Sequence, residues 1–177
     1  MKKIIPVFLV FFLSFSVSSG QETVKRVKWY TFQEAVKLSK ENPKKLFIDV
    51  YTDWCGWCKK MDKETFEHPE IARILNREYY PVKFDAESKE PIEFDGKTFI
   101  NEGGRSRSPH QLAVALLKGQ MSYPSVAYMS EDLQLLSTIP GYYSPERIEP
   151  MLLYFANDHY KTKRWDEFQA SFESGIK

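Results

Sequence analysis

The sequence predicts an α/β fold in which helices flank a mixed central β-sheet. Between residues 24 and 119, apolar segments of strand length alternate with segments of helical periodicity. Two neighbouring strands follow at residues 125–129 and 133–139, joined by a short turn at Glu131-Asp132. Alternation of strands and helices favours parallel pairing, whereas a short turn between two strands requires antiparallel pairing. The two patterns together predict a mixed sheet.

The composition fits one globular domain at residues 21–177. The chain has 177 residues, of which 42% are hydrophobic and 28% are charged. Without residues 1–20, which contain two of the 25 basic residues and none of the 24 acidic ones, the net charge becomes −1. No long basic block remains, so we expect neither nucleic acid nor a membrane surface as a partner.

The first twenty residues have the pattern of an export signal. Lys2 and Lys3 precede an apolar run at residues 4–17, and Ser18 and Gly20 are small residues at the positions that signal peptidase reads. As a helix the run would span about 21 Å, against roughly 30 Å of bilayer hydrocarbon. We therefore expect a signal peptide at about residues 1–20, an exported, periplasmic protein, and no stable membrane anchor after cleavage.

The first elements of the domain have clear boundaries. Residues 24–29 alternate weakly and predict a first strand. Thr31 and Glu34 have the spacing of a capping box, which predicts a helix that starts at Phe32 and ends near Asn42-Pro43.

The middle of the domain continues the alternation. Residues 46–51 are the apolar run of a buried central strand, interrupted only by Asp49. A helical stretch follows over about residues 56–66, and Pro69 opens another helix. Residues 79–84 predict the next strand.

Residues 86–108 form a predicted insertion. Asp95-Gly96 suits the two-residue turn of a β-hairpin. The register of that hairpin places Ile92 opposite Phe99, with Phe94 on the same face.

Two capped helices are predicted after the insertion. Ser108, Pro109 and Gln111 have the spacing of a cap, a first helical residue and a capping-box partner, and Gly119 ends this helix. Its inward residues are Leu112, Ala115 and Leu116. Ser144-Pro145 opens a further helix, which carries its own apolar stripe. Trp165, Phe168 and Phe172 predict one more helix, and so a C-terminal helical extension at about residues 160–177.

The two cysteines, Cys55 and Cys58, carry the strongest chemical signal. They lie where a buried strand leads into a helix. A cysteine at a helix N-terminus is stabilised as the thiolate, which is the form that attacks disulfides. A second cysteine one turn later lies within reach to resolve a mixed disulfide. This pattern predicts thiol–disulfide exchange.

Three other interpretations of the pair are weaker. A structural disulfide would close a very short loop and would stabilise the fold little. A metal site needs about four ligands, but the chain has no second cysteine pair and its three histidines are scattered. A related fold without catalytic function would normally have lost one of the cysteines. We therefore expect no metal and no bound cofactor other than the Cys55–Cys58 disulfide.

The segment at residues 47–60 resembles the active-site segment of the thioredoxin superfamily, and the resemblance covers roughly residues 29–158. It is similar to exported thioredoxin-like proteins and to the C-terminal thioredoxin-like domain of DsbD. The resemblance implies a thioredoxin fold, with Cys55 as nucleophile and Cys58 as resolving cysteine. It also implies that Asp49 is a buried proton acceptor and that Pro124 is the cis-proline. Gly141 resembles the glycine that leaves room beside the active site.

The resemblance leaves alternatives and one departure. Asp49 could instead be a hydrogen-bonded strand residue without a catalytic role. Pro124 could instead be an ordinary trans proline. Trp57 replaces the proline of thioredoxin and the histidine of strong oxidases, so a strong oxidant is disfavoured. The expected function is an exported protein-disulfide oxidoreductase of reductase type. The alternative is a binding module of the same fold with a structural disulfide.

The resemblance also gives expectations for partners. Trp54, Gly56 and Trp57, with Tyr123 and Pro124, should shape a docking surface for protein thiols and disulfides and for a redox partner protein. In this interpretation Cys55 is the exposed thiol. Residues 103–107 lack an apolar anchor, so we expect a mobile basic loop that selects acidic partners, or a solvated decoration without a role.

Overall fold

A computed structural model describes residues 26–104 and 107–176. Its centre is a four-stranded sheet with the strand order β2-β1-β5-β6. β1 pairs in parallel with β2, and the pairs β1–β5 and β5–β6 are antiparallel. The predicted mixed sheet is therefore confirmed. The strands are β1 (Lys45–Tyr51), β2 (Tyr79–Asp85), β5 (Ser125–Met129) and β6 (Leu135–Pro140).

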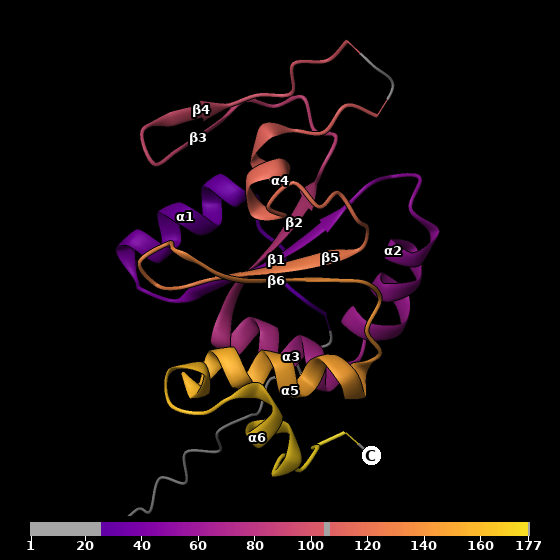
Figure 1. The fold of residues 1–177 in the computed structure, drawn as a ribbon, viewed down its shortest axis with the longest axis vertical. Helices are drawn as coiled ribbons and strands as arrows, with labels where there is room; N and C mark the ends of the chain where they lie inside the picture. The colour runs from indigo at the N-terminus through magenta and orange to yellow at the C-terminus, as the bar shows by residue number, and fades with distance from the viewer. Residues whose placement is uncertain (1–25, 105–106, 177) are drawn as a thin grey trace, which may run out of the picture.

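Helices cover both faces of this sheet (Figure 1). α1 (Phe32–Glu41) and α4 (Gln111–Leu116) pack with one face, and α3 (Pro69–Glu78) and α5 (Pro145–Ala156) cover the other. Each face has its own buried apolar cluster. α2 (Gly56–Met61) follows β1 and continues into a π-helix (Asp62–Phe66).

The N-terminal side of α1 confirms one expectation and corrects another. The Thr31 hydroxyl accepts from the Glu34 amide at 3.2 Å, and the Glu34 carboxylate accepts from the Thr31 amide at 2.8 Å. This is the predicted capping box. The predicted first strand is wrong within the described residues, where Tyr30 makes a single isolated bridge to Val82 before the helix starts. Residues 24–25 of that prediction lie outside the described residues.

The hairpin consists of β3 (Ile92–Phe94) and β4 (Lys97–Phe99), with Ile92 opposite Phe99 as predicted. Asp95 and Gly96 have φ values of 50° and 71°, which the two-residue turn requires. Ile92 is buried, and the Phe94 ring meets Phe32 of α1 edge to face at 5.1 Å. The hairpin is therefore held on the α1 side of the domain.

The predicted cap of α4 is wrong by two residues. His110 is the N-cap, and its buried imidazole Nδ1 accepts from the Leu112 amide at 3.1 Å. The Ser108 hydroxyl instead donates to the Gly103 carbonyl, and the Gln111 side chain accepts from the Ile100 amide. The inward face also differs from the prediction, because Ala115 is exposed and Ala113 is buried.

The C-terminal extension is helical, as expected. A short 3₁₀-helix (His159–Lys161) and α6 (Trp165–Ala170) follow α5. Tyr154 of α5 meets the rings of Trp165 and Phe168 at 5.3 Å and 5.2 Å. The extension therefore belongs to the core on this face of the sheet. Of the described helices, none combines the length and apolar character needed to cross a bilayer.

Candidate redox site

Cys55 and Cys58 lie at the junction between β1 and α2 and form a disulfide with a Cα–Cα distance of 5.3 Å. The Cys55 amide donates to the Thr52 carbonyl at 3.1 Å, which closes a tight turn after the strand. Cys55 is the N-cap of α2, and its sulfur accepts from the Cys58 amide at 3.1 Å. A thiolate at Cys55 would thus face a backbone donor at the positive end of a helix.

The exposure of the pair differs from the expectation. Cys55 is 5% exposed and Cys58 is 2% exposed, so the expected exposed Cys55 is not found in this disulfide form. The bond joins the two sulfurs to each other, and the flanking indoles stand further out, with Trp54 47% and Trp57 57% exposed. The surface that a partner meets first is therefore aromatic.

Trp54 is held by Tyr123, with which the sequence analysis grouped it, and by Glu87 and Arg107, which the sequence analysis did not connect to it. Its indole Nε1 donates to Glu87 Oε1 at 2.9 Å, and its ring meets Tyr123 edge to face at 6.0 Å. The Arg107 guanidinium lies 4.4 Å from the centre of the Trp54 ring. The insertion therefore contributes two contacts to the tryptophan next to Cys55.

These contacts correct the picture of a loop without an anchor. The Gly103 amide donates to the Asn101 side chain at 3.1 Å, and Asn101 also donates to the carbonyls of Glu87 and Ser108. Together with the stacking of Arg107, these bonds fix both ends of the segment at residues 103–107. Arg105 belongs to the loop that was predicted to be mobile, but residues 105–106 lie outside the described part of the chain.

Trp57 lies in a second aromatic group. Its ring meets Tyr142 at 5.5 Å, and Lys60 Nζ lies 5.0 Å and 5.3 Å from the centres of these two rings. The Tyr142 hydroxyl donates to Glu64 at 2.6 Å, and Lys60 pairs with the same carboxylate at 3.8 Å. Lys60, the cation in contact with the Trp57 ring, thus has Glu64 as an acidic partner within the protein.

The segments around Pro124 and Gly141 are joined by their backbones. The Tyr123–Pro124 peptide bond is cis, as the resemblance implied. The Gly141 amide donates to the Pro124 carbonyl at 2.8 Å, and Gly141 has a φ of 104°, which favours glycine. Gly56 has no positive φ, and a Cβ there would meet nothing within 4 Å. Burial also raises the pKa of Tyr123 to about 12.

Asp49 is buried on β1, as predicted, at 1% exposure. Its Oδ2 accepts from Lys83 Nζ at 2.5 Å, whereas its Oδ1 has no hydrogen-bond partner among the described residues. Burial raises the pKa of Asp49 to about 6, although the Lys83 charge acts in the opposite direction. A carboxyl group with this pKa can both accept and release a proton near neutral pH.

Lys83 and Asp62 complete this network, and the sequence analysis missed both. Lys83 Nζ also donates to Asp62, which is the C-cap residue of α2 and whose amide donates to the Cys58 carbonyl. Lys83 therefore connects the buried Asp49 to the helix that carries the cysteines. The available signal was Lys83 itself, a single charged residue in the middle of the apolar run at residues 79–84.

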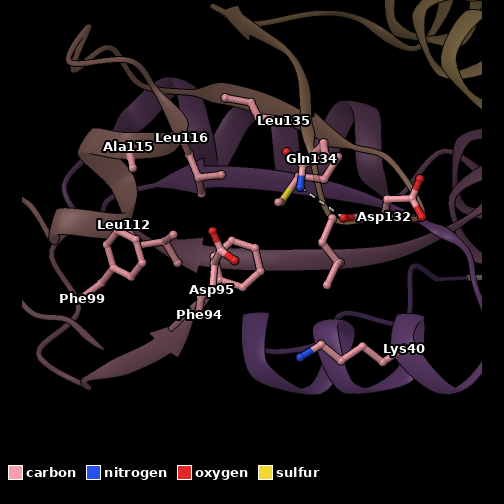
Figure 2. A pocket seen from close by; sticks show the side chains of 12 residues that line it. Lys40, Phe94, Asp95, Phe99, Leu112, Ala115, Leu116, Asp132, Gln134 and Leu135 are labelled. Carbon is pink, nitrogen blue, oxygen red and sulfur yellow. Dashed lines mark hydrogen bonds between the residues drawn. The ribbon is translucent and has the colours of Figure 1, made fainter. Parts of the chain in front are cut away.

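A metal site or a pocket elsewhere in the described residues would be an alternative candidate site. Among the described residues, no group of three or more His, Cys, Asp and Glu side chains could hold a metal ion. A pocket of about 290 Å³ opens between the hairpin, α4 and the β5–β6 turn. Figure 2 shows Phe94, Phe99 and Leu112 along its wall and Lys40 near its rim. None of the predicted site residues lines it, so the aromatic surface around the disulfide remains the candidate site.

Comparison with known proteins gives the family. Residues 15–156 match the Thioredox_DsbH family, described as a protein of unknown function, DUF255. The chain therefore belongs to this family. Human spermatogenesis-associated protein 20 is 32% identical over 81 residues, which are 45% of this chain and 10% of that protein. The thiol:disulfide interchange protein DsbD of Vibrio vulnificus is 38% identical over 45 residues, 25% of this chain and 8% of that protein. The matched segments thus span about a tenth of these relatives.

Solved structures confirm the fold. A DsbH oxidoreductase superposes with a TM-score of 0.55 at 16% identity, covering 82% of this chain and 94% of that one. A thioredoxin from Thermus thermophilus superposes with a TM-score of 0.55 at 12% identity, covering 73% of this chain and 87% of that one. The chain has the thioredoxin fold with a Cys-x-x-Cys pair, and the resemblance to thioredoxin-like and DsbD proteins is confirmed.

Proposed function

We propose that this protein is a protein-disulfide oxidoreductase that exchanges its Cys55–Cys58 dithiol and disulfide with client proteins. The observation that carries the proposal is the Cys55–Cys58 bond at the start of α2, flanked by two exposed tryptophans. A structural disulfide would have little use for an aromatic surface around it, whereas a client chain needs such a surface to dock.

The reaction proceeds in two exchanges. In the reduced protein, the Cys55 thiolate attacks one sulfur of a client disulfide, and the other client sulfur leaves as a thiolate that takes up a proton. Cys58 then loses its proton and attacks Cys55 in the mixed disulfide. This step releases the second client thiolate and forms the Cys55–Cys58 disulfide. The client gains two electrons and the protein loses two.

Asp49 is the proton acceptor for Cys58 in this proposal. Its position on β1 and its link through Lys83 to α2 support the role. Oδ2 is occupied by Lys83, so Oδ1 is the atom that takes the proton. The pKa of about 6 leaves Asp49 largely ionised at neutral pH and still basic enough to accept a proton.

The direction proposed is reduction of clients, and the protein is exported. Trp57 places no cation before Cys58, so the thiolate form lacks the extra stabilisation that favours strong oxidants. A separate redox partner protein must then reduce the disulfide again, and no bound cofactor is needed. The predicted export signal at residues 1–20, which lies outside the described residues, supports the proposed periplasmic location.

Trapping of mixed disulfides tests the assignment. A Cys58→Ala variant lacks the resolving thiol and should accumulate mixed disulfides with clients that a reducing agent releases. A Cys55→Ala variant should trap few clients, because Cys58 lies inside α2 whereas Cys55 is at its N-cap. Equal trapping by the two variants, or trapping by neither, would contradict the assigned roles.

The alternative is a binding module whose disulfide is structural. The reduction potential separates the two functions, because structural disulfides lie below about −300 mV, whereas thioredoxin-type pairs lie near about −270 mV or higher. Equilibration of the purified protein with glutathione or dithiothreitol buffers gives this value. A potential in the structural range would favour the binding module.

A further inference from the structure

We infer that Arg107 and Trp54 form a recognition site for an acidic residue next to the client's disulfide. This inference rests on the proposed function and specifies the clients of the same site. It concerns the part of the insertion that contacts Trp54, the residue before Cys55, and a minimal thioredoxin lacks this insertion.

Several hydrogen bonds in the insertion hold Arg107 next to the Trp54 ring. Its base is closed by the His110 amide, which donates to the Ala86 carbonyl at 2.6 Å. Ser108, the next residue after Arg107, is tied to Gly103 and Asn101. The backbone of Arg107 has a φ of 64°, a conformation that non-glycine residues rarely adopt. The chain thus holds the Arg107 side chain over the indole at a fixed place.

Stacking leaves the polar edge of the guanidinium available. Arg107 lies over the Trp54 ring at 4.4 Å, so one face of its planar group is covered by the indole. In the described part of the chain, its side chain takes part in no ion pair and no hydrogen bond. Its N–H groups can therefore donate hydrogen bonds to a carboxylate from outside, for which the flat fork of arginine is well shaped.

The Trp54 side of the disulfide differs in its charged residues from the Trp57 side. Glu87 accepts the indole N–H of Trp54 at its Oε1 and, within the described residues, forms no ion pair with Arg107. On the Trp57 side, Lys60 already pairs with Glu64. Arg107 is thus a cation in contact with the Trp54 indole that, among the described residues, pairs with no acid. A client carboxylate next to its disulfide would find its partner there.

Peptide reduction tests this preference. The substrates are two disulfide-linked peptides that differ only in having Glu or Gln on both sides of the cysteine. At low salt, kcat/KM of the wild-type protein should favour the Glu peptide by about threefold to tenfold. The preference should shrink in 0.5 M salt, since screening weakens exposed charge pairs.

Variants locate the preference. Arg107→Gln should bring the ratio of the two rates close to one, and Arg107→Glu should invert it. Lys97→Gln is the matched control, because it removes the same charge from the hairpin end of the same insertion. Its ratio should equal that of the wild type. An inverted ratio cannot arise from a merely disordered loop.

The outcomes separate this inference from the proposed function. Reduction of both peptides at equal rates by the wild-type protein would overturn the recognition site and leave the oxidoreductase function standing. An equal loss of preference in Lys97→Gln and Arg107→Gln would also overturn it. Failure to reduce either peptide or the neutral hydroxyethyl disulfide would contradict the proposed function itself.

Discussion

Asp49 and Lys83 are register partners in the parallel pair of β1 and β2, and their side chains meet at 2.5 Å. Because neighbouring residues of paired strands project to the same face, this register alone brings the two charges together. Lys83 also reaches Asp62 at the end of α2. One partly buried lysine therefore serves two carboxylates with different exposure, and the protonation of Asp49 depends on both neighbours.

The buried Asp49 should make the stability of the oxidised protein depend on pH. Its folded pKa of about 6 lies above its unfolded value, so the folded protein binds more protons between these values. The free energy of unfolding therefore falls as the pH rises from about 4 to about 6. Asp49→Asn should lack this loss and be more stable above pH 6, by about 1–3 kcal/mol. Urea unfolding at several pH values measures the difference.

Asp53→Asn is the control for this experiment, since Asp53 is an exposed residue that follows the same strand. It should leave the pH dependence as in the wild type. If Asp49→Asn is equally or less stable than the wild type at pH 8, burial does not dominate the energetics of Asp49.

Asp62 should tune Asp49 through their shared lysine. The negative charge of Asp62 raises the pKa of Asp49, and Asp62 also takes part of the hydrogen-bonding capacity of Lys83. Asp62→Asn should therefore lower the pKa of Asp49 and move the pH profile of the resolving step to lower pH. Titration of the Asp49 carboxyl carbon by NMR gives the pKa directly. Glu64→Gln is the control, because it removes a charge from the same π-helix but from a residue that is bonded to Tyr142. It should leave the pKa of Asp49 unchanged.

Replacement by alanine should have different effects at Gly141 and at Gly56. Gly141 has a φ of 104°, and an added Cβ would meet nothing within 4 Å, so the cost of Gly141→Ala is one of backbone conformation. We expect a loss of about 1–2 kcal/mol in the free energy of unfolding. Gly56→Ala also has open space but lies in the first turn of α2 without a positive φ, and should be neutral or stabilising by up to about 1 kcal/mol. Equal effects of the two substitutions in urea unfolding would refute this explanation.

Local signals predicted most of the fold, and contacts between distant segments were the part that the sequence did not reveal. The Thr31 capping box and the Asp95-Gly96 turn depend on residues a few positions apart, so both were predicted correctly. The cap of α4 was misplaced because a buried imidazole, His110, does what Ser108 was expected to do. Arg107 over Trp54 joins residues 53 positions apart, and no local pattern encodes that pairing. Lys83 was visible as a charge in an apolar strand, but its partner became known only from the register.

The hairpin should anchor the insertion through Ile92, whose side chain is buried in the cluster on the α1 side. Ile92→Ala removes apolar contacts from a packed site and should lower the free energy of unfolding by about 2–4 kcal/mol. Thr98→Ala, on an exposed position of the same hairpin, should cost less than about 0.5 kcal/mol. Urea unfolding of both variants tests whether the insertion belongs to the cooperative core. If Ile92→Ala unfolds at the wild-type urea concentration, the hairpin lies on the domain without contributing to its stability, and Asn101 and the closed base of the insertion alone position Arg107.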